Sequence, residues 1–171
     1  AVYQRRSDES GSAGDECPHR ATIPRHVQSA NVKWVPRTAV ALIALHLAVR
    51  AVLAFHGYFY WDDLILTGRA STQGLLSPSY LFDDHDGHVM PGAFLIAGAI
   101  TRLAPLEWIW PAISLVVLQL VASLALLRAL YVILGWRPVM LLPLTFALFT
   151  PLALPSFAWW AAALNALPMV A

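Results

Sequence analysis

The chain has 171 residues, of which 58% are hydrophobic and only 12% are charged, and its mean hydropathy is +0.61. A soluble domain does not need this much apolar surface, so the composition excludes an ordinary soluble fold and predicts an integral membrane protein. The formal net charge of +1 says little as a total, and the single cysteine, Cys17, excludes an internal disulfide.

The first 35 residues are polar and show no apolar periodicity. Charged side chains of both signs alternate there with Ser, Gly and Pro, a composition typical of a disordered tail. No continuous apolar core is followed by a small-residue cleavage site, so the segment does not resemble a signal peptide. Lys33 and Arg37 lie beside the first apolar segment and place this tail in the cytoplasm by the positive-inside rule.

Residues 36–55 form the first predicted membrane helix, because their apolar character is nearly continuous over about one bilayer thickness. An outer loop of about residues 57–88 follows, with half of the chain's acidic residues against a single basic one, Arg69. Within this loop, residues 63–70 contain no breaker except Gly68, and we expect them to form a short helix near the membrane surface.

Four further apolar segments follow the loop, over residues 89–104, 108–134, 139–154 and 159–171. The segment 108–134 is the clearest second crossing. If residues 89–104 cross fully, Arg128 and Arg137 fall outside, against the positive-inside tendency. If they form a partial or surface helix, both arginines lie inside and Trp159 and Trp160 return to the outer face. We favour the second arrangement.

The predicted fold class is therefore all-α, a polytopic transmembrane helix bundle with an outer-face loop that contains a short surface helix. Its predicted parts are a disordered cytoplasmic tail over residues 1–35 and a transmembrane region over residues 36–171. The chain begins at Ala1 and stops inside an apolar stretch, so we expect it to be the N-terminal part of a longer membrane domain. We expect a multi-pass plasma-membrane protein with no nucleic-acid partner.

Two adjacent carboxylates, Asp62 and Asp63, follow the first predicted helix directly. At that position they meet both water and lipid headgroups, and paired carboxylates suit a general base or a metal ion. The structural alternative is that Asp62 caps a helix beginning at Asp63, with both carboxylates near its positive end.

A second polar run, residues 82–88, holds three carboxylates and two imidazoles. Oxygen ligands favour Mg²⁺, Mn²⁺ or Ca²⁺, while His85 and His88 leave Zn²⁺ open. Asp84 and Asp86 are the ligands we expect for such a divalent cation, Mg²⁺ or Mn²⁺. The alternative is a solvated polar turn with no cation.

Two more features could bind a substrate. Arg50 lies one helical turn after His46 near the outer end of the first helix, and its guanidinium suits a lipid-borne phosphate; the alternative is snorkelling to the headgroups. Trp159 and Trp160 could line a sugar-binding surface or anchor the chain at the membrane interface.

The order of these features resembles the N-terminal part of membrane glycosyltransferases of the GT-C superfamily, which includes protein mannosyltransferases and the aminoarabinose transferases of lipid A. In several of these enzymes an acidic pair follows the first helix, as Trp61-Asp62-Asp63 does here. Further along, the family commonly has Lys-Pro-Pro where this chain has His88-Val89-Met90-Pro91. The resemblance covers residues 36–171 in the order of elements.

The resemblance implies a polyprenyl-phosphate-linked sugar as donor, a glycan or protein as acceptor, and transfer on the outer face. It implies Asp62 as the general base, Asp63 in support, and His88 at the position of a phosphate-contacting residue. Many such enzymes need no metal, so a divalent cation remains an open alternative. The rival hypothesis is a non-enzymatic transporter or scaffold subunit, in which the acidic loop is a solvated surface. A transporter should show paired charges deep in its spans and repeated halves.

Overall fold

The computed structural model describes residues 33–153 and 158–170, and this part of the chain is mostly helical, as predicted. The tail predicted over residues 1–35 lies outside the described residues except for its last three. Of those, Trp34 and Val35 already belong to the first helix. That helix therefore begins two residues earlier than the apolar pattern indicates.

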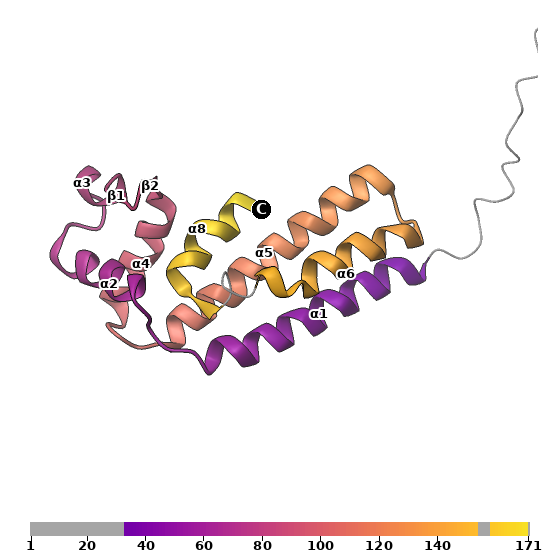
Figure 1. The fold of residues 1–171 in the computed structure, drawn as a ribbon, viewed down its shortest axis with the longest axis horizontal. Coiled ribbons are helices and arrows are strands. Elements are labelled where there is room, and N and C mark those ends of the chain that lie inside the picture. Colours follow the sequence, from indigo (N-terminus) through magenta and orange to yellow (C-terminus); the bar gives the residue numbers. More distant parts are fainter. Residues whose placement is uncertain (1–32, 154–157, 171) are drawn as a thin grey trace, which may run out of the picture. The chain divides into compact units, whose positions relative to one another are not determined.

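Two helices in the described part are long and apolar enough to cross a membrane: α1 (Trp34–Phe55) and α5 (Ile109–Leu134). At 1.5 Å per residue, the 22 residues of α1 extend about 33 Å, roughly one hydrocarbon thickness. The two helices pack side by side and run in opposite directions (Figure 1). Small residues such as Ala39 and Ala112 are fully buried, whereas large apolar side chains such as Val52 and Val121 are exposed.

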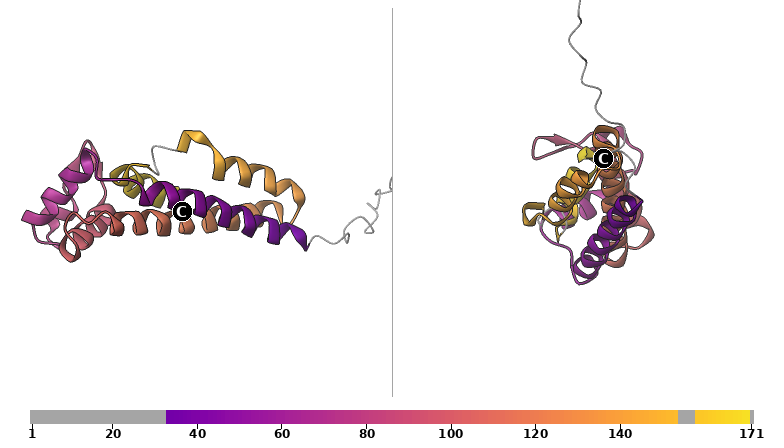
Figure 2. Two further views of the ribbon diagram at one scale, coloured as in Figure 1. Left: turned by 90° about the horizontal axis from the view of Figure 1, so that it is seen from below. Right: turned by 90° about the vertical axis from the view of Figure 1, so that its right-hand side faces the viewer.

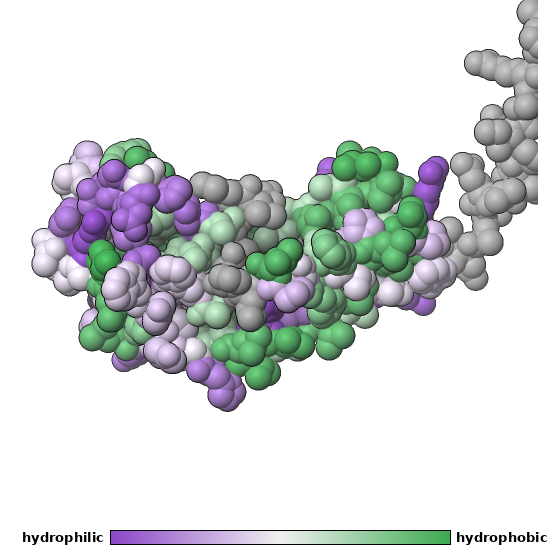
Figure 3. Space-filling view, viewed as in Figure 1, coloured by the Kyte–Doolittle hydropathy of each residue, from purple (hydrophilic) through white to green (hydrophobic). Residues whose placement is uncertain are grey.

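The residues between these two helices form a separate layer of short elements. They are α2 (Asp62–Thr72), α3 (Pro78–Leu81), β1 (Asp84–His85), β2 (His88–Val89) and α4 (Pro91–Leu103). The strands pair as an antiparallel hairpin, which the all-α prediction did not include. Hydrophilic side chains gather over α3 and the β1–β2 hairpin, whereas apolar side chains cover α1 and the neighbouring α6 end (Figure 3).

The segment predicted over residues 89–104 is the 13-residue helix α4. It extends about 20 Å, shorter than a hydrocarbon core, and it packs mainly on α2. Leu66 and Ala70 of α2 share a buried apolar cluster with Phe94 and Ala97 of α4. At the far end of α4, Arg102 donates hydrogen bonds to backbone carbonyls at the end of α2. These contacts hold α2 and α4 together as one unit.

Of the segment predicted over residues 139–154, η2 (Pro138–Met140) leads directly into α6 (Leu141–Phe149), and Thr150 separates this helix from η3 (Pro151–Ala153); residue 154 lies outside the described residues. Proline lacks the backbone N–H that an α-helix needs in its interior, so Pro138 and Pro151 bound the α-helical part. α6 lies against α1, where Leu144 and Leu148 pack on Ala39 and Ile43 (Figure 2). The last described element, α8 (Trp160–Val170), packs on α5 and on α4.

α3 and α4 approach each other closely at Gly98. The Tyr80 hydroxyl donates a 2.8 Å hydrogen bond to the carbonyl oxygen of Phe94, and its ring packs edge-to-face on Phe94. A Cβ on Gly98 would lie 2.8 Å from that hydroxyl oxygen and 2.6 Å from Leu75 Cδ1. The buried tyrosine therefore leaves no room for a side chain at Gly98.

We expect Gly98→Ala to lower the free energy of unfolding by about 1–3 kcal/mol, because the methyl group overpacks a filled core and displaces the Tyr80 hydroxyl. Gly92→Ala is the matched control, since the same helix offers open space at that position and alanine favours a helix over glycine. Thermal unfolding of both variants in detergent measures the difference. Equal stability of the two variants would contradict the packing described here.

Candidate functional site

The C-terminal end of α1, which precedes the acidic pair in the chain, contacts the N-terminal end of α5. Trp108, at the N-cap of α5, donates its indole N–H to the carbonyl oxygen of Ala54 over 2.7 Å. Gly57 lies against the same indole, and a Cβ there would come within 2.7 Å of Trp108 Cζ2. Glycine is therefore required for this close approach, and the contact sets where the chain leaves α1.

The two carboxylates of the acidic pair point in different directions. Trp61 has a positive φ of 42°, and α2 begins at Asp62 directly after it. Successive residues of an α-helix are rotated by about 100°, so neighbouring side chains cannot share a face. Asp62 stays partly exposed, whereas Asp63 is completely buried. Asp62 does not cap the helix, since no side-chain cap bond is present and the N-cap residue is Trp61.

Asp63 joins the N-terminal ends of two helices. Its Oδ2 accepts a 2.9 Å hydrogen bond from the backbone N–H of Tyr60, and its Oδ1 accepts one of 2.7 Å from the backbone N–H of Ala161, in the first turn of α8. The Ala161 bond satisfies a donor that the start of α8 leaves without an intrahelical partner, and the Tyr60 bond binds the carboxylate to the residue that precedes the N-cap of α2. Burial raises the pKa of Asp63 to about 6, and these two hydrogen bonds oppose the rise.

The β1–β2 hairpin brings the second polar run beside α2. Asp86 and Gly87 form its turn with φ of 51° and 81°, and Asp84 Oδ1 accepts a 2.8 Å hydrogen bond from the Gly87 N–H. Arg69 of α2 pairs with Asp83 at 3.0 Å and donates to the Asp84 carbonyl oxygen at 3.3 Å. The arginine therefore holds the hairpin against α2.

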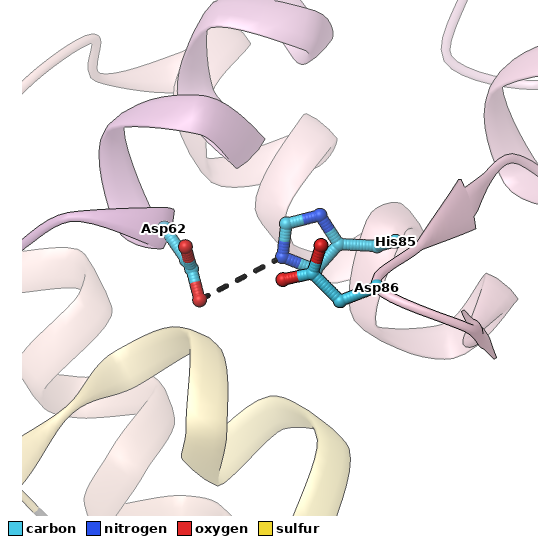
Figure 4. A group of neighbouring side chains, drawn as sticks. All are labelled: Asp62, His85 and Asp86. Carbon is cyan, nitrogen blue, oxygen red and sulfur yellow. Dashed lines mark ion pairs between the residues drawn. The ribbon is translucent and has the colours of Figure 1, made fainter.

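Three side chains from these two elements meet in one cluster: Asp62, His85 and Asp86. One ligand atom from each lies within 4.8 Å of the other two. Figure 4 shows the His85 ring with its Nε2 directed toward Asp62, and the distance to Asp62 Oδ2 is 3.8 Å. This Asp62–His85–Asp86 cluster can accept a proton or hold a divalent cation.

His85 is the buried member of the cluster. The residue is only 7% exposed, and its ring packs edge-to-face on Phe94. Its Nε2 has no hydrogen-bond partner among residues 33–153 and 158–170. Asp86, by contrast, is exposed at the tip of the hairpin. The buried His85 ring thus has a fixed position in the cluster, whereas Asp86 gives the cluster access to solvent.

Some of the predicted site residues lie outside this cluster. Asp84, which we expected to share a cation with Asp86, instead closes the hairpin turn, and His88 is exposed on β2. Arg50 lies on α1 and is buried at 7% exposure, one turn from His46, whose ring packs edge-to-face on Phe149. The structure therefore groups Asp86 with Asp62 and His85 instead of with Asp84, a neighbourhood that depends on the position of the hairpin against α2.

The two predicted tryptophans have different environments at the start of α8. Trp160 is completely buried and donates its indole N–H to Ser114 Oγ at 2.9 Å. Trp159 is half-buried and packs edge-to-face on Tyr60, and its Nε1 is buried without a hydrogen-bond partner in the part of the chain that the structure describes. It lines a cavity of about 370 Å³ at the end of α1, together with aromatic residues Tyr58, Tyr60 and Trp108.

Comparison with known proteins supplies no relative: no family model matches the chain, and no curated protein or solved structure is detectably similar to it. The chemistry of the site is therefore argued from its own residues.

The raised pKa of Asp63 predicts a pH-dependent stability. Between its ordinary value of 3.8 and about 6, the folded protein holds a proton that the unfolded chain has released. The stability of the fold therefore falls as pH rises through this range. Asp63→Asn cannot ionise, so the melting temperature of the wild type should fall relative to that of the variant over the same range.

Thermal unfolding in detergent at a series of pH values measures this difference. The variant keeps every other ionisable group of the chain, so any pH dependence that the two proteins share cancels in the difference. A constant difference between wild type and Asp63→Asn at every pH would show that Asp63 does not titrate as described.

Proposed function

We propose that the chain is part of a multi-pass membrane glycosyltransferase that transfers a sugar from a polyprenyl-phosphate donor to a glycan or protein acceptor at the outer face. The observation that carries the proposal is the position of Asp62. It is the carboxylate of the acidic pair that stays free of backbone hydrogen bonds, and it lies in a polar cluster just beyond the end of an apolar helix.

A topology with α1 and α5 as crossings supports this arrangement. Because the two helices run in opposite directions, Arg37 near the start of α1 and Arg128 near the end of α5 lie at the same end of the pair. The acidic loop lies at the opposite end. This distribution agrees with the positive-inside rule for a cytoplasmic N-terminus. It leaves α4 outside the spans, as its length and its packing on α2 favour.

The chemistry that Asp62 would perform is a proton transfer coupled to glycosyl transfer. The acceptor oxygen forms a bond to the anomeric carbon as its proton passes to the Asp62 carboxylate. The bond between the anomeric carbon and the phosphate oxygen breaks, and polyprenyl phosphate leaves with the electron pair. A base at the boundary of water and lipid can meet a soluble acceptor while the donor's lipid tail stays in the bilayer.

The aromatic cavity beside the loop supports a sugar-binding role for Trp159. Its side chain is half-buried and lines this cavity beside Tyr58 and Tyr60, so its exposed part could pack against a sugar ring. Trp160 is unsuited to this role, because its ring is buried and its N–H is already bonded to Ser114. Arg50 is the cation on α1 that we assign to the leaving phosphate.

Transfer from a panel of radiolabelled polyprenyl-phosphate sugars tests the proposal, with membranes containing the protein or its Asp62→Asn variant at equal expression. We expect the variant to lose at least about a hundredfold in rate, as removal of a general base does, while donor binding persists. Glu107→Gln, which removes an exposed carboxylate that belongs neither to the cluster nor to the contacts that hold the hairpin, should retain transfer.

Equal transfer by wild type and Asp62→Asn would remove Asp62 from the mechanism. Absence of transfer with every donor would favour a membrane protein without enzymatic activity, a transporter or a scaffold subunit.

A further inference from the structure

We propose that Asp62, His85 and Asp86 form a binding site for one divalent transition-metal ion, Mn²⁺ or Zn²⁺. The site differs from the Asp84–Asp86 pair that the sequence indicates, since it uses one residue from α2 and two from the hairpin. It does not depend on the transferase proposal, because its ligands and its test concern binding alone.

The geometry is close to that of a three-ligand metal site. With metal–ligand bonds of about 2.1 Å, ligand atoms around a tetrahedral ion lie about 3.4 Å apart. Asp62 Oδ2 and His85 Nε2 are already 3.8 Å apart, and all three ligand atoms lie within 4.8 Å. Asp86 is exposed at the hairpin tip, so a change of its rotamer closes the remaining distance.

The buried imidazole gives an independent reason to place a ligand here. His85 Nε2 has lost its contact with water and has no hydrogen-bond partner, although buried polar atoms are nearly always satisfied. If this nitrogen is unprotonated, its lone pair faces the lone pairs of two carboxylates, which is unfavourable. A bound cation accepts electron pairs from all three atoms and so removes this repulsion.

The ligand chemistry selects the class of ion. Two carboxylates and one imidazole suit Mn²⁺ or Zn²⁺, whereas Mg²⁺ and Ca²⁺ prefer oxygen ligands alone. Three protein ligands leave at least one position open. If the proposed transferase activity holds, an acceptor hydroxyl in that position becomes more acidic, and the second oxygen of a monodentate Asp62 can receive its proton.

Metal binding by the purified whole chain in detergent tests the proposal, after removal of metals with a chelator. Isothermal titration with Mn²⁺ and Zn²⁺, and paramagnetic resonance for Mn²⁺, should show one ion per chain. Mg²⁺ and Ca²⁺ should bind more weakly. His85→Ala and Asp86→Asn should each weaken binding at least about tenfold, since even substitutions beyond the direct ligands cost this much.

Two controls keep the result interpretable. Asp86→Asn should leave the fold intact, because the residue is exposed and asparagine tolerates its positive φ; a loss of binding in this variant is therefore not caused by unfolding. His88→Ala removes the exposed imidazole of the same hairpin and should leave the affinity unchanged, because His88 is not one of the grouped ligand residues.

The site is overturned if the wild type binds neither ion, or if His88→Ala weakens binding as much as His85→Ala, which would indicate adventitious capture by surface imidazoles. Binding without sugar transfer would retain the metal site and remove the transferase proposal. Transfer that persists in chelator, with no ion bound, would do the reverse.

Discussion

The buried carboxylate of Asp63 is the interaction on which the arrangement of the polar end depends. It accepts one backbone hydrogen bond at the entrance of α2 and another from Ala161 in the first turn of α8, 98 positions from Asp63 in the sequence. A charged acceptor makes stronger hydrogen bonds than a neutral one, while its burial without them would be costly. The same carboxylate therefore holds the two helix starts together and leaves Asp62 free to face the hairpin.

The two carboxylates of the acidic pair have different contacts because of helical geometry. Adjacent residues of a helix point in different directions. The Asp63 carboxylate is therefore buried between α2 and α8, whereas the Asp62 carboxylate lies beside His85 and Asp86. Arg69 then determines how near the hairpin lies, through its contacts with Asp83 and Asp84. The Asp62–His85–Asp86 cluster is thus positioned by residues that do not belong to it.

Local pattern in the sequence was sufficient to predict α1, α5 and the short helix α2, because each is a run with one dominant character and few breakers. The hairpin was missed although Asp86-Gly87 is a residue pair typical of a tight hairpin turn, because its strands are only two residues long and show no apolar alternation. The selection of His85 over His88 could not be predicted either. It depends on Phe94 lying behind the hairpin, a contact made only when α4 folds back on α2.

The indole of Trp108 has a consequence for mechanical behaviour. Its hydrogen bond to Ala54 and its contact with Gly57 join the last turn of α1 to the first turn of α5, so the junction cannot serve as a hinge. If α1 moves along its own axis, α5 must therefore move with it. The distance between the polar cluster and the apolar helices is then fixed by the Trp108 contacts, and not by the length of a flexible loop.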